Sequence, residues 1–338
     1  MLLAAALTDI SLAVVCDKAS QGRVPCTKLA GGHEMPQIAM GTGGYNDCAS
    51  DKFACKSQHA RFAVETWLGL GARHVDTAND YRTQTAVATA LQGIPREEVF
   101  ITTKCPGPIG YEGIIQCADA NLQMLGQFTD EGIGYVDLLL IHFPFTFAAR
   151  CSLNATSPFS EPGCSTPASK AALQDSWRAM EELKRIGVVR SIGVSNYNST
   201  HIEQTLESAK EPIEVNQVQW HPKHHEDDLL AYCRSHGIQL QAFSSLGGTG
   251  SAGGVLSHPT VKAIAGAHNV STAQVTLRWS VQQGIPVVVG TADPSHAATD
   301  LEVFGFGLSQ DEMDQISAIQ GDDGAPRGMV SHLLPLSI

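Results

Sequence analysis

Short aliphatic runs alternate with longer amphipathic segments along most of this chain. The short runs are rich in Val, Ile and Leu and are bounded by turn residues, which predicts eight β-strands: Ile38–Gly41, Ala72–Asp76, Val99–Lys104, Val136–His142, Val189–Ser195, Val215–Gln219, Gln239–Ser244 and Pro286–Gly290. The longer segments carry apolar residues at helical spacing and predict helices: Gln58–Leu70, Thr83–Gln92, Tyr111–Met124, Lys170–Arg185, Thr200–Ala209, Asp227–His236, Thr260–His268, Thr272–Gln282 and Gln310–Ile319.

Eight successive strand–helix units favour an α/β fold of the (β/α)8 TIM-barrel type over an open doubly wound sheet. Runs such as Leu138–Ile141 are apolar without alternation, as expected of strands that are buried on both faces. The loops that follow the strands build the active site in such barrels. Two long loops, Asn154–Ser169 and Gly247–Gly254, follow the fourth and seventh strands and are predicted on that face.

A small β-hairpin is predicted ahead of the first strand, because Cys26–Leu29 and His33–Pro36 flank the turn residues Ala30, Gly31 and Gly32. We expect this hairpin to cover the opposite end of the barrel. No linker divides the chain, so residues 26–338 are expected to form a single domain. Residues 1–25 are expected to be a poorly ordered extension.

Composition and charge exclude several functions. The 338 residues carry a net charge of −12, which disfavours binding to nucleic acid because that needs a basic face. No run of about 18 apolar residues predicts a membrane span. Met1–Val15 is apolar but is broken by Asp9, and no basic residue precedes Lys18, unlike a secretory signal. We therefore expect a cytoplasmic monomer or weak oligomer, with secretion or organelle targeting through a degenerate signal as the alternative.

The nine cysteines leave two interpretations open. Cys48 and Cys55 bracket one polar loop and Cys151 and Cys164 another, and either pair can form a disulfide in an oxidising compartment. The odd count and the absence of a C-x-x-C motif favour free thiols. No spacing of Cys and His resembles a zinc site, so no metal is predicted.

Four polar residues stand at the ends of three consecutive predicted strands. Asp76 ends the second strand and Tyr81 follows it closely, Lys104 ends the third strand, and His142 ends the fourth. Neighbouring parallel strands bring such residues to one patch. An ammonium group beside Tyr81 is expected to lower the pKa of its phenol, and Asp76 is expected to hold that ammonium in place. His142 would orient a carbonyl oxygen, so the patch predicts a proton donor for a developing alkoxide.

Each of these residues has a simpler explanation when it is taken alone. A strand-end lysine is usually a solvated charge, a histidine after an apolar run is usually a core residue, and Asp76 can cap a turn. Four complementary groups on three consecutive strands are much harder to explain in that way.

These residues and several motifs resemble the aldo-keto reductase family, over a stretch from about Cys26 to Ile319. Asp76, Tyr81, Lys104 and His142 match the family's tetrad in order and context. The other matches are Met35-Pro36 through Gly41-Thr42-Gly43, His142-Phe143-Pro144, Gly193-Val194-Ser195-Asn196, Asn216-Gln217 and Phe243-Ser244-Ser245-Leu246-Gly247. The resemblance implies reduction of a small-molecule aldehyde or ketone by NAD(P)H, with the tetrad as catalytic residues and Tyr81 as general acid.

The resemblance also implies the remaining site residues. The cofactor would be bound by Gly41, Thr42, Gly43, Asp76, Ser195, Asn196, Gln217, Phe243, Ser244, Leu246, Thr291, Ala292, His296 and Asp300. Side chains such as Ser195, Asn196 and Gln217 offer the donors and acceptors that a nicotinamide amide needs. The substrate would contact Tyr45, Tyr81, Pro106, His142 and Phe143.

One departure concerns the adenosine 2′-phosphate, which this family holds with a Lys and an Arg after the eighth strand. Thr291 and His296 stand near those positions, and no Lys or Arg occurs between Arg278 and Arg327. Asp300 is a candidate partner for a ribose 2′-hydroxyl instead, by analogy with NAD sites of another fold. NADP(H) is the expectation from the family, and weakened selectivity with use of NAD(H) is our hypothesis.

A second departure concerns the substrate wall. Gly43, Pro106 and Phe143 replace bulkier residues that are common in the family, which predicts a larger pocket. The Gly-rich loop Gly247–Gly254 is expected to close poorly over the cofactor and to let it exchange faster.

Two other functions remain open from the sequence. One is a non-catalytic module of the same fold that binds cofactor and senses redox state, although such a module need not keep all four tetrad groups. The other is a lyase or aldolase that uses Lys104 as a Schiff base. A neighbouring Asp76 argues against the second function because an ion pair keeps the amine protonated.

Overall fold

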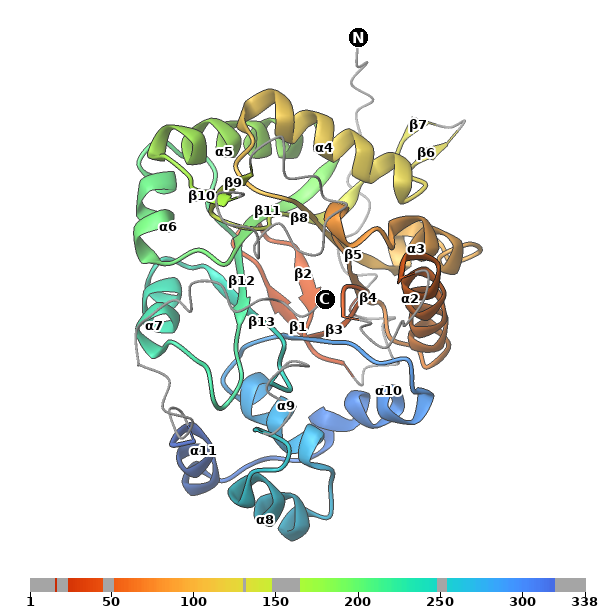
Figure 1. The fold of residues 1–338 in the computed structure, drawn as a ribbon, viewed down its shortest axis with the longest axis vertical. Helices are drawn as coiled ribbons and strands as arrows, with labels where there is room; N and C mark the ends of the chain where they lie inside the picture. The colour runs from red at the N-terminus through yellow and green to blue at the C-terminus, as the bar shows by residue number, and fades with distance from the viewer. Residues whose placement is uncertain are drawn as a thin grey trace.

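The computed structural model describes residues 16, 24–44, 52–129, 132–147, 165–247 and 254–319. Eight parallel strands close into a barrel in the order β11-β12-β13-β14-β3-β4-β5-β8. Helices surround this barrel as an outer layer (Figure 1). The predicted (β/α)8 fold is therefore confirmed.

The barrel strands lie close to their predicted positions. They are β3 (Ile38–Gly41), β4 (His74–Asp76), β5 (Phe100–Cys105), β8 (Val136–Ile141), β11 (Val189–Ser195), β12 (Val215–Gln219), β13 (Gln239–Phe243) and β14 (Val287–Val289). The helices are α2 (Lys52–Gly69), α3 (Gln84–Ala90), α4 (Gly110–Met124), α5 (Lys170–Arg185), α6 (Ser199–Leu206), α7 (Asp227–Ser235), α8 (Pro259–His268), α9 (Thr272–Gln282), α10 (Pro294–Leu301) and α11 (Gln310–Ser317). Short 3-10 turns are η2 (Asn79–Tyr81), η3 (Arg96–Glu98) and η4 (Glu302–Gly305).

Local signals explain several helix starts. Asn198, Ser271 and Ser309 each accept a hydrogen bond from the backbone three residues later, and the side chain at that later position bonds back to the cap. Each of these capping boxes satisfies two backbone donors that the first helical turn otherwise leaves unpaired.

The strand β8 shows how one apolar run serves two cores. Leu138 and Leu140 belong to a small cluster inside the barrel, whereas Leu139 and Ile141 pack in the large core between the barrel and the helices. Successive side chains of a strand point to opposite faces, and both faces of β8 are covered. Every residue of β8 is therefore buried, which explains why no polar residues alternate with the leucines.

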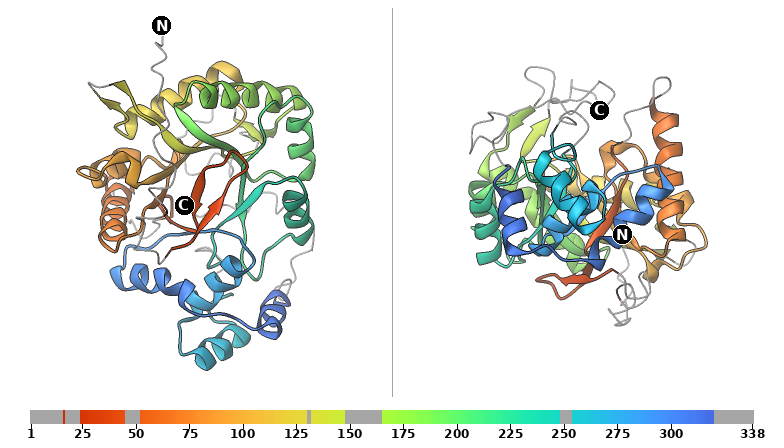
Figure 2. Two further views of the ribbon diagram at one scale, coloured as in Figure 1. Left: turned by 180° about the vertical axis from the view of Figure 1, so that it is seen from behind. Right: turned by 90° about the horizontal axis from the view of Figure 1, so that it is seen from below.

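The predicted N-terminal hairpin is present as β1 (Cys26–Lys28) and β2 (Glu34–Pro36), which pair antiparallel. It lies across one end of the barrel (Figure 1, and Figure 2, right). Leu29 and Met35 join the cluster inside the barrel. The turn is fixed because the backbone N–H of Gly31 donates to Glu214 at 3.0 Å. The hairpin thus closes the end of the barrel opposite the carboxyl ends of the strands.

Some elements were not predicted. The helix α10 begins with Pro294, and its N-cap Asp293 accepts from the backbone of Ser295 at 2.8 Å. Two short antiparallel strand pairs are also present, β6 (Phe128–Thr129) with β7 (Gly132–Ile133) and β9 (Phe145–Phe147) with β10 (Ser165–Pro167). Most of the two predicted long loops lies outside the described residues. No helix in the described part of the chain is long and apolar enough to cross a membrane.

The cysteines correct the expectation of free thiols. Cys16 is disulfide-bonded to Cys26 and Cys105 to Cys117, two pairs that the sequence did not suggest. Cys55 is also disulfide-bonded, and its predicted partner Cys48 lies outside the described residues, as do Cys151 and Cys164. Within the described part of the chain, Cys233 is a free thiol and is buried.

We expect Gly193→Ala to destabilise the barrel between β11 and β12. A Cβ atom there would meet the backbone oxygen of Val215 and would lie 2.8 Å from a methyl carbon of Leu140. Overpacking of this kind typically costs about 1–3 kcal/mol, which urea unfolding will measure. The control is Gly266→Ala in α8, where nothing lies near the added atom. That change is expected to stabilise by about 0.5–1 kcal/mol, and equal effects of the two changes would contradict the interpretation.

Candidate active site

The carboxyl ends of β4, β5 and β8 form one patch, because these strands are neighbours in the barrel. Asp76 is the last residue of β4, Lys104 lies at the end of β5, and His142 follows β8 directly. Tyr81 is the last residue of the turn η2, which follows β4. The four residues of the predicted tetrad are therefore brought together.

Lys104 is the centre of this patch. Its Nζ donates to Asp76 Oδ1 at 2.6 Å, to the backbone oxygen of Thr77 at 3.1 Å and to the phenol oxygen of Tyr81 at 3.4 Å. The side chain of Lys104 has no exposed surface and that of Asp76 is 3% exposed. A buried charge needs a partner and several hydrogen bonds, and Lys104 has both. The ammonium thus lies within hydrogen-bond distance of the phenol.

The expected fall in the pKa of Tyr81 is wrong for this structure. Burial raises the pKa of Tyr81 well above its usual value, and the charges of Asp76 and Asp80 raise it further. Tyr81 consequently keeps its proton through neutral and moderately alkaline pH, as a proton donor must.

The predicted nicotinamide residues are joined to the tetrad by hydrogen bonds. Gln217 Nε2 donates to the second carboxylate oxygen of Asp76 at 2.8 Å. Ser195 Oγ donates to the backbone oxygen of Gln217 at 2.7 Å, and Asn196 Nδ2 donates to Ser195 Oγ at 3.1 Å and to the backbone oxygen of His142 at 2.9 Å. One network therefore fixes these amides and the tetrad acid together.

Gly43 corrects part of the prediction of a larger pocket. A Cβ atom at Gly43 would lie 2.8 Å from ring carbons of Tyr81, so the phenol ring occupies the space that a side chain would fill. The neighbouring Thr42 bonds to the backbone oxygen of Asp76 at 3.2 Å and accepts from Thr83 at 3.0 Å. The absence of a side chain at Gly43, after β3, therefore leaves room for the phenol ring that follows β4 and does not enlarge the substrate pocket.

The other predicted substrate and cofactor residues lie on the same face of the barrel. Phe143 stacks on the ring of His142 with centroids 4.1 Å apart, and Pro106 is half-buried. Phe243 ends β13, and Ser244 follows it with a φ of +51°, in the left-handed region. The half-buried Leu246 follows in the same turn, and Gly41 is packed against Val288, whereas Tyr45 lies outside the described residues.

The N-terminus of α10 carries a negative charge where a 2′-phosphate was considered. Asp293 caps this helix, and hydrogen bonds from the side chain and backbone of Ser295 lower the pKa of the Asp293 carboxyl. Thr291 is uncharged, and its hydroxyl accepts a hydrogen bond from the backbone N–H of Asp293 at 3.0 Å. Ala292 packs against the core, and His296 is exposed. The backbone donors of the first turn are thus already bound to a carboxylate.

Asp300 lies at the other end of α10 and is only 4% exposed. Burial raises the pKa of Asp300 to about 7. Such burial leaves little of the carboxylate for a ribose hydroxyl, which weighs against the predicted role in cofactor binding.

Comparisons with known proteins agree with this geometry. The model of the Aldo/keto reductase family matches residues 37–320. The chain belongs to the aldo/keto reductase family. It is 32% identical over 299 residues to the glyoxal reductase of Bacillus subtilis, covering 88% of this chain and 93% of the relative. It is also 32% identical over 300 residues to the 9,11-endoperoxide prostaglandin H2 reductase of Trypanosoma cruzi, covering 88% of this chain and 92% of the relative. The aldose reductase structure from Schistosoma japonicum matches with a TM-score of 0.76 at 27% identity, covering 92% of this chain and 96% of that one.

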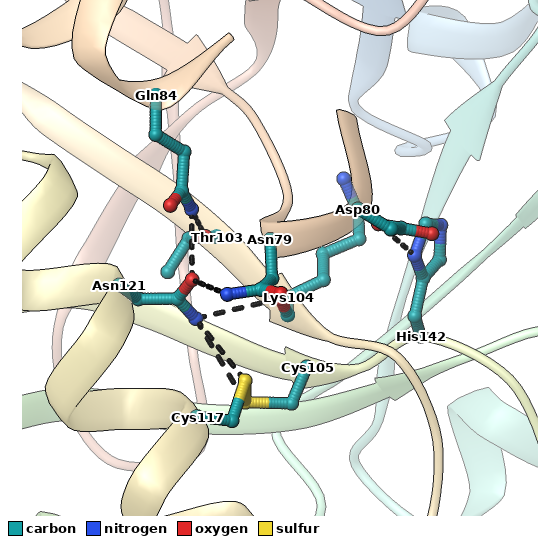
Figure 3. The surroundings of a disulfide bond; sticks show 9 residues. All are labelled: Asn79, Asp80, Gln84, Thr103, Lys104, Cys105, Cys117, Asn121 and His142. Atoms are coloured by element: carbon teal, nitrogen blue, oxygen red, sulfur yellow. Dashed lines mark hydrogen bonds and ion pairs between the residues drawn. A yellow bond between two sulfur atoms is a disulfide. The ribbon is translucent and has the colours of Figure 1, made fainter. Parts of the chain in front are cut away.

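This aldo/keto reductase contains site residues that the sequence analysis missed. Asp80 contacts His142, and Gln241 accepts from Gln217 at 2.9 Å. Asn121 on α4 contacts both sulfur atoms of the disulfide between Cys105 and Cys117 and the backbone oxygen of Lys104 (Figure 3). Only Asp80 left a signal in the sequence, as an acid directly before the tetrad tyrosine. The other contacts join residues that are distant in the chain or lie on different elements.

We expect Asp300→Asn to raise the free energy of unfolding above that of the wild type, and to raise it more at alkaline pH than at acidic pH. The folded-state pKa of Asp300 is raised, so its neutral form favours folding at low pH and that contribution is lost as pH rises toward 7. At about 1.4 kcal/mol per pH unit, the advantage of the variant should grow by up to roughly 3 kcal/mol between pH 5 and pH 8. Urea unfolding at both pH values measures it. The exposed Asp119→Asn serves as control, and an equal gap at both pH values would refute the burial argument.

Proposed function

We propose that this reductase transfers a hydride from NAD(P)H to an aldehyde or ketone, and that Tyr81 protonates the resulting alkoxide oxygen. The observation that supports the proposal is the Lys104 ammonium, 2.6 Å from Asp76 and 3.4 Å from the phenol of Tyr81. A fixed charge beside the phenol stabilises the phenolate that remains after proton transfer. An alkoxide is a stronger base than a phenolate, so the transfer remains downhill although burial raises the pKa of Tyr81.

The nicotinamide end of the proposed cofactor fits the residues present. The cofactor supplies the hydride when it is bound. Ser195, Asn196 and Gln217 place hydroxyl and amide groups on the barrel face next to Asp76, and these groups suit a carboxamide. Phe243, at the end of β13, offers an aromatic surface against which a flat ring can be held. Bound in this way, a nicotinamide ring would be held by Ser195, Asn196, Gln217 and Phe243 and would supply its hydride close to Tyr81.

A Schiff-base reaction at Lys104 is disfavoured by the same geometry. Lys104 has no exposed side-chain surface and is hydrogen-bonded to a carboxylate, so a substrate carbonyl would have to displace that contact to reach a protonated amine. A redox sensor without catalysis has no observation that favours it. Absence of carbonyl-dependent NAD(P)H oxidation over a broad panel would favour the sensor.

The substrate class remains small-molecule carbonyls. Relatives named for glyoxal and for prostaglandin H2 differ widely in substrate size, so relationship alone does not select one substrate. The disulfides between Cys16 and Cys26 and between Cys105 and Cys117 weigh against the predicted cytoplasmic location, because structural disulfides are rare in reducing compartments. They favour the alternative of an oxidising compartment.

We expect Tyr81→Phe to abolish carbonyl reduction while cofactor affinity changes less than about threefold. The variant keeps the ring, which packs against Gly43, and removes only the hydroxyl that delivers the proton. Removal of a general acid typically costs a factor of about 100 to 10,000 in kcat. Absorbance at the nicotinamide band measures turnover, and quenching of protein fluorescence measures cofactor binding. Turnover within tenfold of wild type would refute the role of Tyr81.

We further propose that the preference for NADP(H) is weakened and that NAD(H) is used. The carboxylate of Asp293 already binds the first-turn amides of α10, where a 2′-phosphate would need cations, and repels a second anion. Dissociation constants for NADPH and NADH should therefore differ by less than about tenfold. Asp293→Asn should tighten NADPH binding more than NADH binding, because only the former carries the extra phosphate. A hundredfold preference of the wild type for NADPH would refute this proposal.

A further inference from the structure

An acid that lies outside the tetrad touches the tetrad histidine. Asp80 is the middle residue of the turn η2, and its Oδ1 lies 3.1 Å from Nδ1 of His142, which follows β8 (Figure 3). The two side chains are 20% and 8% exposed. The contact joins residues 62 positions apart and connects the turn that carries Tyr81 to the end of β8.

The remaining surroundings of the His142 ring leave one nitrogen for a substrate. Phe143 stacks on one face of the ring, and the edge of Tyr81 lies against it with centroids 5.5 Å apart. Within the described part of the chain, Nε2 of His142 has no hydrogen-bond partner. Two titratable groups contact the ring, Asp80 and Tyr81 on η2. The next ones are Lys104 on β5, which bonds to the phenol of Tyr81, and Asp76 on β4, which bonds to Lys104.

The charge of Asp80 determines which ring nitrogen carries hydrogen. Burial raises the pKa of Asp80, but the charge of His142 and the hydrogen bond from it, together with the charge of Lys104, outweigh burial and leave the pKa below its usual value. Asp80 is therefore a carboxylate at neutral pH, and a carboxylate only accepts hydrogen bonds. Nδ1 of His142 must then carry the hydrogen atom.

We infer that Asp80 is a positioning residue that holds His142 in the tautomer with hydrogen on Nδ1. The inference rests on the proposed carbonyl reduction for its consequence, but the hydrogen bond is independent of any substrate. A neutral imidazole has a single N–H, so Nε2 presents a lone pair when Nδ1 is protonated. Only the doubly protonated ring donates from Nε2 to a carbonyl oxygen, whereas the neutral ring accepts from the hydroxyl of an alcohol.

The consequence concerns a second hydrogen-bond donor for the carbonyl oxygen, besides Tyr81. A neutral ring with hydrogen on Nδ1 cannot donate from Nε2 to that oxygen, whereas a neutral ring with hydrogen on Nε2 can. In Asp80→Leu the neutral ring is free to carry its hydrogen on Nε2 and to donate it to the carbonyl oxygen, so kcat/KM for reduction should depend less on pH in this variant than in the wild type.

The direct test is the tautomer of His142 in the free protein. Histidine-labelled wild type and Asp80→Leu are compared in 1H–15N NMR spectra from pH 5 to pH 10, and His142→Gln identifies the resonances. We expect the neutral ring of the wild type to carry hydrogen on Nδ1 and that of Asp80→Leu to carry it on Nε2. Thermal unfolding checks that the variant folds, and Asp80→Ala replaces it if it does not. Asp119→Asn, an exposed acid on α4, is the control and should match the wild type.

Each outcome decides the inference. Hydrogen on Nε2 in the wild type, a ring that stays doubly protonated throughout the pH range, or hydrogen on Nδ1 in both proteins would overturn it. The NMR result needs neither cofactor nor turnover, so it stands even if no carbonyl is reduced. If the tautomer changes as expected but the wild type reduces no carbonyl, the proposed function fails and the role of Asp80 remains.

Discussion

The buried ion pair between Asp76 and Lys104 is the interaction on which the rest of the site depends. Neither side chain has appreciable exposure, so each charge is tolerated only because the other lies 2.6 Å away. Breaking such a pair leaves an unpaired buried charge and typically costs about 3–5 kcal/mol. The second oxygen of Asp76 binds Gln217, and the ammonium also reaches the phenol of Tyr81. The pair thus couples the barrel interior, the amides considered for nicotinamide and the proposed proton donor.

Around this pair, the position of the phenol is set by contacts from several directions. The backbone at Gly43 lies against the ring of Tyr81, and Asp80 anchors the same turn to His142. Asn79 anchors it to Asn121 on α4, at 3.1 Å. Asn121 in turn contacts the disulfide between Cys105 and Cys117 (Figure 3). The short 3-10 turn η2 is thereby fixed by three separate contacts.

Charge distinguishes the two ends of the proposed cofactor site. The nicotinamide end contains neutral amides and hydroxyls that are joined to the tetrad. The end near α10 contains Asp293 as a helix cap and Asp300 as a buried acid, and its exposed histidine, His296, is not a permanent cation. A helix N-terminus attracts anions only while its amides are available. At α10 the protein's own carboxylate binds these amides, which is the physical basis of the proposal that discrimination between the two nicotinamide cofactors is weakened.

The sequence by itself determined the barrel, the hairpin and the tetrad. Strand and helix periodicity is local, and the order of parallel strands brings the ends of β4, β5 and β8 together without further information. Only the tertiary structure decided the contacts that depend on distances between elements: the phenol ring in the space beside Gly43, the disulfide partners, the burial of Asp300 and the bond from Asp80 to His142. The tertiary structure also decided that the pKa of Tyr81 is raised and not lowered, because the shift depends on how completely the phenol is removed from water. The burial of these groups and the pairing of residues that are distant in the chain depend on how the elements pack against one another. Local sequence periodicity predicts the elements but not these contacts.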